Sequence, residues 1–120
     1  MAKKILVVDD SATVRQQLNL TLTSAGYAVE EARDGKEGLD KISAAKDLSI
    51  VICDVNMPRM NGIEMLKNVK SQGLSVPVIM LTTEGQPALI RQAREEGAKG
   101  WMVKPFNPDL LLKAVEKLAA

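Results

Sequence analysis

I-V-I-C-D-V-N-M-P-R-M-N-G, residues 50–62, joins a short apolar run directly to an aspartate and then to Pro58 and Gly62. A continuous apolar run that ends at turn residues is typical of a strand buried on both faces of a parallel sheet. A carboxylate at the end of such a strand is costly unless another group compensates its charge. The rest of the chain must therefore supply that compensation.

Apolar runs of similar length recur along the chain and alternate with longer amphipathic stretches that predict helices. The runs are residues 4–8, 28–32, 50–53, 78–81 and 101–103. This alternation predicts an α/β fold, with a doubly wound five-stranded parallel sheet flanked by five helices. Five strands favour the flavodoxin-like order 2-1-3-4-5. The run at 28–32 is more polar than the others, so we expect it at an edge of the sheet.

Helix boundaries are marked by capping residues. Ser11 is expected to cap a helix that begins near Thr13, and residues 107–109, N-P-D, combine a cap, a proline in the first turn and an acid. Gly38 falls inside the second predicted helix, where glycine costs about 1 kcal/mol relative to alanine. The expected helix ends fall at Gly26, Gly73 and Gly97.

Composition excludes several classes of function. The chain has 120 residues, 46% of them hydrophobic, which predicts a single domain over residues 1–120 with no output domain. The aromatic residues, Tyr27, Trp101 and Phe106, are too few to stack bases, and the net charge is +1, so nucleic acid is not an expected partner. No apolar stretch is long enough for a membrane span, so we expect a soluble cytoplasmic protein with no membrane partner.

Two residue types limit the chemistry. Cys53 is the single cysteine, which excludes an intramolecular disulfide, and we expect it to be a small buried hydrophobic residue. The chain has no histidine. Any imidazole that takes part in phosphorus chemistry must therefore belong to a partner.

Polar residues follow the predicted strands at the ends where ligands bind in a sheet of this type. These residues are Asp9, Asp10, Asp54, Thr82, Thr83 and Lys104. Clustered carboxylates raise one another's pKa, and a divalent cation relieves the repulsion. Carboxylate and carbonyl oxygens suit Mg²⁺, which keeps several waters. The sequence therefore predicts a magnesium site at this edge.

A carboxylate beside Mg²⁺ and a lysine is suited to act as the nucleophile in phosphoryl transfer. Such a transfer requires mainly positioning and neutralisation of the charge on the phosphoryl oxygens, which Mg²⁺, Lys104 and the hydroxyl of Thr82 would provide. Neither a P-loop nor a G-x-G-x-x-G motif is present, so we do not expect a bound nucleotide.

Four motifs in register carry a resemblance to a known family. They are V-V-D-D-S (7–11), C-D-V-N-M-P-x-M-N-G (53–62), M-L-T-T (80–83) and V-K-P-F (103–106). Together they resemble the receiver domain of two-component response regulators, and the similarity covers the whole chain. It is greatest to the stand-alone chemotaxis regulators of the CheY type.

The resemblance implies a role for each residue of the acidic site. Asp54 would accept the phosphoryl group. Asp10, Asp54 and the main-chain carbonyl of Asn56 would hold Mg²⁺, with Asp9 helping through water. Lys104 would pair with the phosphoryl group, and its bond to the following proline would be cis.

The resemblance also implies a switch and a set of positions that tune hydrolysis. Thr82 would move to the phosphoryl oxygen and Trp101 would then turn inward, although this position is more often Tyr or Phe. Asn56, Thr83 and Glu84 occupy the tuning positions. The pair Asn56 and Glu84 implies a short-lived phosphorylated state, whereas Thr83, larger than the usual residue there, implies reduced access of water to the acyl phosphate. Asn61 replaces a frequent aspartate, and no function is assigned to it.

The function implied is a phosphorylation-dependent switch. A sensor histidine kinase of the CheA type would donate the group, and a phosphatase is a further possible partner. The face formed by the fourth helix, last strand and last helix would then bind a target such as a flagellar motor switch component.

Three alternatives remain open. The first is a phosphorelay intermediate that passes the group to another histidine protein, and a long-lived phosphorylated state would favour it. The second is a small aspartate-nucleophile phosphatase, which requires an acid at the position of Asn56. The third is a scaffold that binds partners without phosphorylation.

Overall fold

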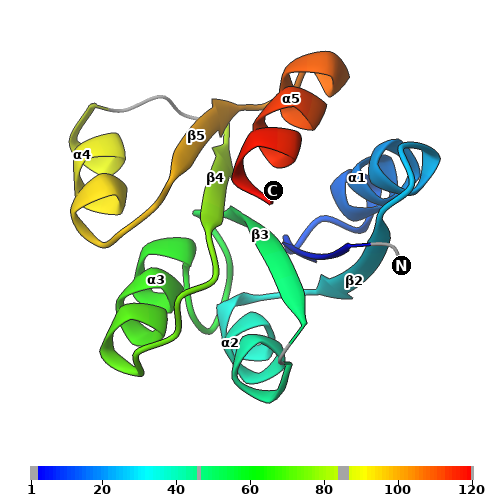
Figure 1. Ribbon diagram of the computed structural model, residues 1–120. Coiled ribbons are helices and arrows are strands. Elements are labelled where there is room, and N and C mark those ends of the chain that lie inside the picture. The colour runs from blue at the N-terminus through cyan, green and yellow to red at the C-terminus, as the bar shows by residue number, and fades with distance from the viewer. Residues whose placement is uncertain (1–2, 46, 84–86, 120) are drawn as a thin grey trace.

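Five parallel strands form the centre of the molecule, and helices cover both faces of the sheet (Figure 1). The computed structural model describes residues 3–45, 47–83 and 87–119, and within these ranges strands and helices alternate strictly. The strands are β1 (Lys4–Val8), β2 (Ala28–Ala32), β3 (Leu48–Asp54), β4 (Val78–Thr82) and β5 (Gly100–Val103). The helices are α1 (Ala12–Ser24), α2 (Gly35–Ala44), α3 (Gly62–Ser71), α4 (Pro87–Glu95) and α5 (Pro108–Leu118).

The strand order is β2-β1-β3-β4-β5 and every pairing is parallel, so the predicted topology is confirmed. The more polar strand, β2, lies at an edge as expected. Strand β3 is longer than the apolar run at 50–53, because it begins at Leu48 and includes Asp54 as its last residue. Asp54 is therefore part of the sheet and not of the loop that follows it.

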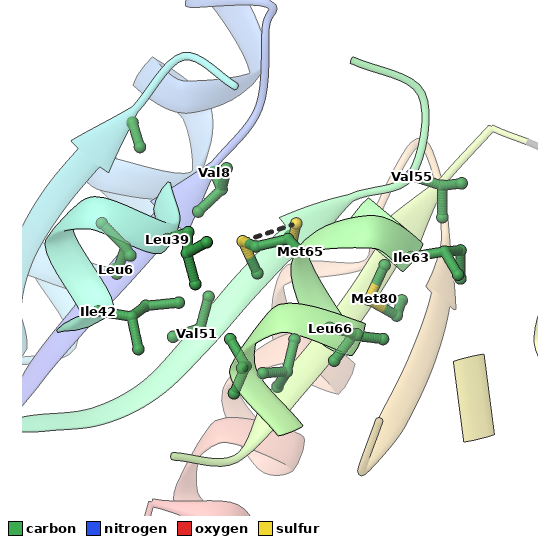
Figure 2. Close-up of a cluster of buried hydrophobic side chains, with 14 of the residues drawn as sticks. Leu6, Val8, Leu39, Ile42, Val51, Val55, Ile63, Met65, Leu66 and Met80 are labelled. Carbon is green, nitrogen blue, oxygen red and sulfur yellow. Dashed lines mark hydrogen bonds between the residues drawn. The ribbon is translucent and has the colours of Figure 1, made fainter. Parts of the chain in front are cut away.

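Each face of the sheet has its own hydrophobic core. Alternate residues of β1 divide between them, with Leu6 and Val8 on one side and Ile5 and Val7 on the other. The first core packs against α2 and α3, and Figure 2 shows its members converging from these two helices and from the strands beneath them. The second packs against α1 and α5. Burial on both faces explains why the strand sequences are continuously apolar.

The predicted caps are present. The hydroxyl of Ser11 accepts a hydrogen bond from the amide of Val14 at 3.3 Å, and α1 begins at Ala12, one residue earlier than expected. Asn107 accepts hydrogen bonds from the amides of Asp109 and Leu110 at the start of α5. Past the ends of α1, α3 and α4, positive φ angles of 96°, 71° and 101° belong to Gly26, Gly73 and Gly97.

Gly38 lies within α2, and its presence there is explained by the close packing of this helix on the sheet. A Cβ at this position would lie 3.0 Å from both methyl groups of Val8 and 3.1 Å from the sulfur of Met65. The helix therefore lies so close to the sheet that a side chain at this position would have to displace Val8 and Met65, and this close contact offsets the low helix propensity of glycine.

Two further features concern the ends of the described chain and the helices as a group. The amine of Lys3 donates a hydrogen bond to the carbonyl of Ala119, which joins the start of β1 to the end of α5. None of the helices in the described ranges is long and apolar enough to cross a membrane.

Candidate metal site at the carboxyl edge of the sheet

The register of the sheet places the predicted site residues at one edge. Val8 pairs with Cys53, so Asp9 and Asp54 follow at neighbouring positions of β1 and β3. Thr82 pairs with Val103, so Lys104 leaves β5 beside the end of β4. These pairings derive from the hydrophobic patterns of the strands, and the polar residues meet because each follows directly on such a pattern.

Three carboxylates form a compact acidic cluster at this edge. Asp9, Asp10 and Asp54 each offer one oxygen, and these oxygens all lie within 4.8 Å of one another. Asp9 is 1% exposed and Asp54 is 6% exposed, whereas Asp10 faces solvent. A cation bound here would have protein oxygens on one side and access to water on the other, which is the arrangement that Mg²⁺ favours.

Lys104 supplies positive charge that compensates the carboxylate at the end of β3. Its Nζ lies 2.7 Å from Oδ2 of Asp9 and 3.4 Å from Oδ2 of Asp54, and its side chain is 13% exposed. Burial by itself lowers the pKa of a lysine, but the hydrogen bond to Asp9 and the charges of Asp9 and Asp54 outweigh it, so the pKa of Lys104 lies above its ordinary value. The side chain therefore stays protonated.

The backbone also places this lysine. The amide of Lys104 donates to the carbonyl of Thr82 at 2.6 Å, and the Lys104–Pro105 bond is cis, as the resemblance implies. The chain bends at Lys104 and Pro105, directly after β5.

Asp54 is a buried carboxylate whose negative charge is only partly offset by Lys104. Its Oδ1 accepts a hydrogen bond from the amide of Val55 at 2.9 Å. Burial, and then the charge of Asp9, raise the pKa of Asp54, while Lys104 and the Val55 amide oppose them without cancelling them. Ionised Asp54 is therefore only partly compensated by the protein, and a divalent cation would complete the compensation.

Each polar group of Asp9 makes a hydrogen bond. Its Oδ1 accepts from the amide of Ser11 at 2.9 Å, and its Oδ2 accepts from Lys104. Its own amide donates to the carbonyl of Ala32, and its carbonyl accepts from Nη1 of Arg15 at 2.6 Å. Asp9 is thus fixed in place on all sides, whereas Asp10 projects toward water.

The start of α3 packs directly against the backbone of Asp54. The amide of Gly62 donates to the carbonyl of Val55, and a Cβ on Gly62 would lie 2.2 Å from the carbonyl oxygen of Asp54. Asn61 caps this helix through a reciprocal box with Glu64, in which each side chain accepts a hydrogen bond from the other residue's amide. The position to which the sequence assigned no function therefore fixes the helix that supports Asp54.

The remaining predicted residues lie around the cluster. Thr82 is fully buried as the last residue of β4, and Thr83 after it is exposed. Asn56 is exposed in the loop between β3 and α3. Glu84 lies outside the described residues.

Trp101, the other half of the predicted switch pair, lies in β5 opposite Met80 of β4. Its side chain is partly buried against the α2–α3 core. Within the described part of the chain its indole Nε1 is buried and has no hydrogen-bond partner. A cavity of about 80 Å³ lies beside the ring, between α4 and β5, lined by residues that include Ile90, Ala93 and Gly100.

Cys53 is fully buried next to Asp54, as expected of a small hydrophobic residue. Burial, followed by the charges of Asp54 and Asp9, raises the pKa of its thiol well above the ordinary value. Its sulfur lies 3.1 Å from the carbonyl oxygen of Asp54 and 3.9 Å from the sulfur of Met65, the contact dashed in Figure 2. The thiol therefore remains protonated and packs as part of the core.

Arg15, Asn61 and Gly62 are the residues at this edge that sequence reasoning missed. The spacing N-x-x-E at Asn61 resembles a capping box and could have been found. Arg15 and Gly62 gave no comparable signal, because their contacts depend on how neighbouring elements approach one another.

Comparison with known proteins agrees with this geometry. Residues 5–116 match the response regulator receiver domain family. The chain is 42% identical to chemotaxis protein CheY1 of Helicobacter pylori over 116 residues, 94% of each chain, and 38% identical to chemotaxis protein CheY of Thermotoga maritima over 120 residues, 99% of each. The structure of Vibrio cholerae chemotaxis protein CheY4 superposes with a TM-score of 0.91 at 45% identity, covering 98% of this chain and 99% of that one. The chain therefore belongs to the response regulator receiver domain family and is a CheY-like receiver of two-component signalling.

Proposed function

We propose that Asp54 accepts a phosphoryl group from a phosphohistidine on a partner kinase of the CheA type. The observation that carries this proposal is the position of the Asp54 carboxylate. It is buried, its pKa is raised, and it lies 3.4 Å from Nζ of Lys104 and within 4.8 Å of oxygens of Asp9 and Asp10, the two acids that follow β1. Receiver domains of the CheY type are generally signalling switches rather than enzymes, and they typically bind Mg²⁺. The absence of histidine in this chain fits a donor on the partner.

The acidic cluster fits Mg²⁺ through its chemistry. Its donors are hard carboxylate oxygens, and the exposed side of Asp10 leaves room for water. Asp10, Asp54 and the main-chain carbonyl of Asn56 would hold the ion, with Asp9 acting through water. When bound, Mg²⁺ would neutralise charge on the phosphoryl oxygens.

The side chains of the site then have distinct parts in the transfer. A carboxylate oxygen of Asp54 attacks phosphorus, the P–N bond of the phosphohistidine breaks, and the imidazole nitrogen keeps the electron pair. Lys104 holds its proton throughout and pairs with a phosphoryl oxygen. The hydroxyl of Thr82 would contact another. Hydrolysis of the acyl phosphate by water would be tuned by Asn56, Thr83 and Glu84.

Phosphorylation would shift the population of the α4-β5-α5 face toward a form that binds a target. Thr82 and Trp101 would couple the site to this face. Val103 of β5 and Leu110 of α5 are large apolar residues that are 49% and 56% exposed, which suits a protein contact. Since similar proteins are chemotaxis proteins, a cytoplasmic flagellar motor switch component is the proposed target, and a phosphatase would end the signal.

Intact-mass spectrometry after treatment with Mg²⁺ and acetyl phosphate tests the acceptor. One phosphoryl group should be gained by the wild type and by Asp40→Asn, which removes an exposed carboxylate of α2. Asp54→Asn should gain none, and chelation of Mg²⁺ should abolish the gain in the wild type and in Asp40→Asn. No gain by the wild type, with Mg²⁺ binding shown separately, would exclude the proposal. A phosphorylated form that lasts for hours would favour a relay to another histidine protein.

A further inference from the structure

Arg15 of α1 is a largely buried cation that touches the backbone of the acidic site. Its side chain is 14% exposed. Its Nη1 donates to the carbonyl oxygen of Asp9 at 2.6 Å, and its Nε donates to Oε1 of Glu31 at 3.1 Å. The guanidinium thus spans two strands, since Asp9 directly follows β1 and Glu31 belongs to β2.

The carboxylate of Glu31 is itself held in a fixed orientation. Asn19, one helical turn after Arg15, donates from Nδ2 to Oε2 of Glu31 at 3.1 Å. The main-chain carbonyl of Glu31 accepts from the amine of Lys41 in α2. Glu31, the anion that pairs with Arg15, is therefore connected to α1, α2 and the sheet, so the guanidinium has little freedom to rotate.

We propose that Arg15 is a positioning residue for the metal site. By holding the carbonyl of Asp9, it fixes the turn in which Asp9 and Asp10 follow one another toward Asp54. The amide of Asp9 is held by Ala32 and its side chain by Ser11 and Lys104, and Arg15 secures the remaining polar group of this residue. This inference rests on the proposed function, since it assumes that the cluster binds Mg²⁺.

The geometry distinguishes positioning from a simple effect of charge. A cation near the cluster would by itself repel Mg²⁺, so loss of the Arg15 charge would strengthen metal binding. Positioning requires the planar fork of arginine, which reaches Glu31 and the Asp9 carbonyl at the same time. Lysine has a single ammonium group and cannot reproduce that fork.

Two substitutions that conserve charge provide the test. Arg15→Lys keeps the cation and loses the fork, and Glu31→Asp keeps the anion and withdraws it from Nε. Each should weaken Mg²⁺ binding about 10-fold, the lower end of the loss seen when groups that orient metal ligands are replaced. Arg91→Lys, on the exposed surface of α4, is the matched control and should bind Mg²⁺ as the wild type does.

Mg²⁺ affinity is measured by titrating MgCl₂ into each protein and following the amide resonances of Asp10 and Asp54. Because only folded protein is observed, a loss of global stability alone would not change the dissociation constant. A second readout is hydrogen exchange of the Ser11 amide, which bonds to Asp9 and should exchange faster in Arg15→Lys.

The outcomes separate this inference from the proposed function. Wild-type affinity in both variants would overturn the role of Arg15 and leave the proposed function intact. Failure of the wild type to bind Mg²⁺ would overturn the metal site itself, and the inference with it. If Arg15→Lys does not fold, Glu31→Asp decides alone, because Glu31 is 38% exposed at an edge strand and its replacement disturbs no core.

Discussion

Asp54 is an ionisable residue that the apo protein holds at a cost. Burial and the charge of Asp9 raise its pKa, so the folded protein favours the protonated form more than the unfolded chain does. The stability contributed by this group is fully present below the ordinary aspartate pKa of 3.8 and is lost as the pH rises through the higher pKa of the folded state. The metal-free protein at neutral pH therefore carries an electrostatic penalty at Asp54, the proposed phosphoryl acceptor.

Removal of that charge should stabilise the metal-free protein. Asp54→Asn is expected to raise the free energy of unfolding at pH 7 in the presence of a chelator, and the gain should shrink as the pH falls toward 4. Urea unfolding at the two pH values measures it. Asp40→Asn removes an exposed carboxylate that pairs with Lys36 and should give no gain. A stability of Asp54→Asn at pH 7 equal to or below that of the wild type would contradict this account.

A second prediction at the residue scale concerns the steric effect of a side chain at Gly62. A Cβ placed 2.2 Å from the carbonyl oxygen of Asp54 forces α3 away from β3, so Gly62→Ala should lower the free energy of unfolding by about 2 kcal/mol or more. Gly100→Ala is the control, because its Cβ would meet Ile79 at an ordinary 3.5 Å. Urea unfolding compares the two, and equal stabilities would show that the α3 contact yields easily.

At the scale of elements, the sequence predicted what depends on local pattern. The apolar runs predicted the strands, and the more polar character of the run at 28–32 predicted that this strand lies at an edge. Ser11 and Asn107 predicted where two helices begin. Features that depend on the approach of distant elements were not predictable. Gly38 looked like a weak point of α2, but its lack of a side chain is what allows the helix to lie against Val8.

The same distinction holds for the candidate site. Each acidic residue could be located because it lies at the carboxyl end of a strand or directly after it, and these strand ends converge in a parallel sheet. Arg15 could not, since its two acceptors lie 6 and 16 residues away in the chain and meet only after α1 packs on the sheet.

The capping of α3 gives a prediction that belongs to this element. Asn61→Ala removes the acceptor for the Glu64 amide and should cost about 1 kcal/mol in the free energy of unfolding. Asn61→Asp keeps the acceptor and adds a negative charge at the helix N-terminus, so it should retain the stability of the wild type. Urea unfolding of both variants is the measurement. A loss shared by the two would mean that the amide group of Asn61, and not the cap, matters.

At the scale of the whole molecule, the proposed metal binding is linked to folding, because the three carboxylates are brought together by the pairing of β1 with β3 in the folded sheet. A ligand that binds the folded state alone raises stability with its concentration, by about 1.4 kcal/mol at ten times its dissociation constant. Mg²⁺ should therefore raise the free energy of unfolding by this amount, as measured by urea unfolding across an Mg²⁺ series. Asp54→Asn should respond less, and an equal response would place the ion elsewhere.

The lone thiol of Cys53 has a practical consequence. It is fully buried in the central strand, one residue before Asp54, and its pKa is raised well above the ordinary value, so the thiol stays protonated. A thiol-modifying reagent can reach it only when β3 parts from its neighbours. The labelling rate of the wild-type protein therefore measures how often the sheet opens locally. The extent to which a bound ion or a phosphoryl group slows that rate measures how strongly it stabilises the closed sheet.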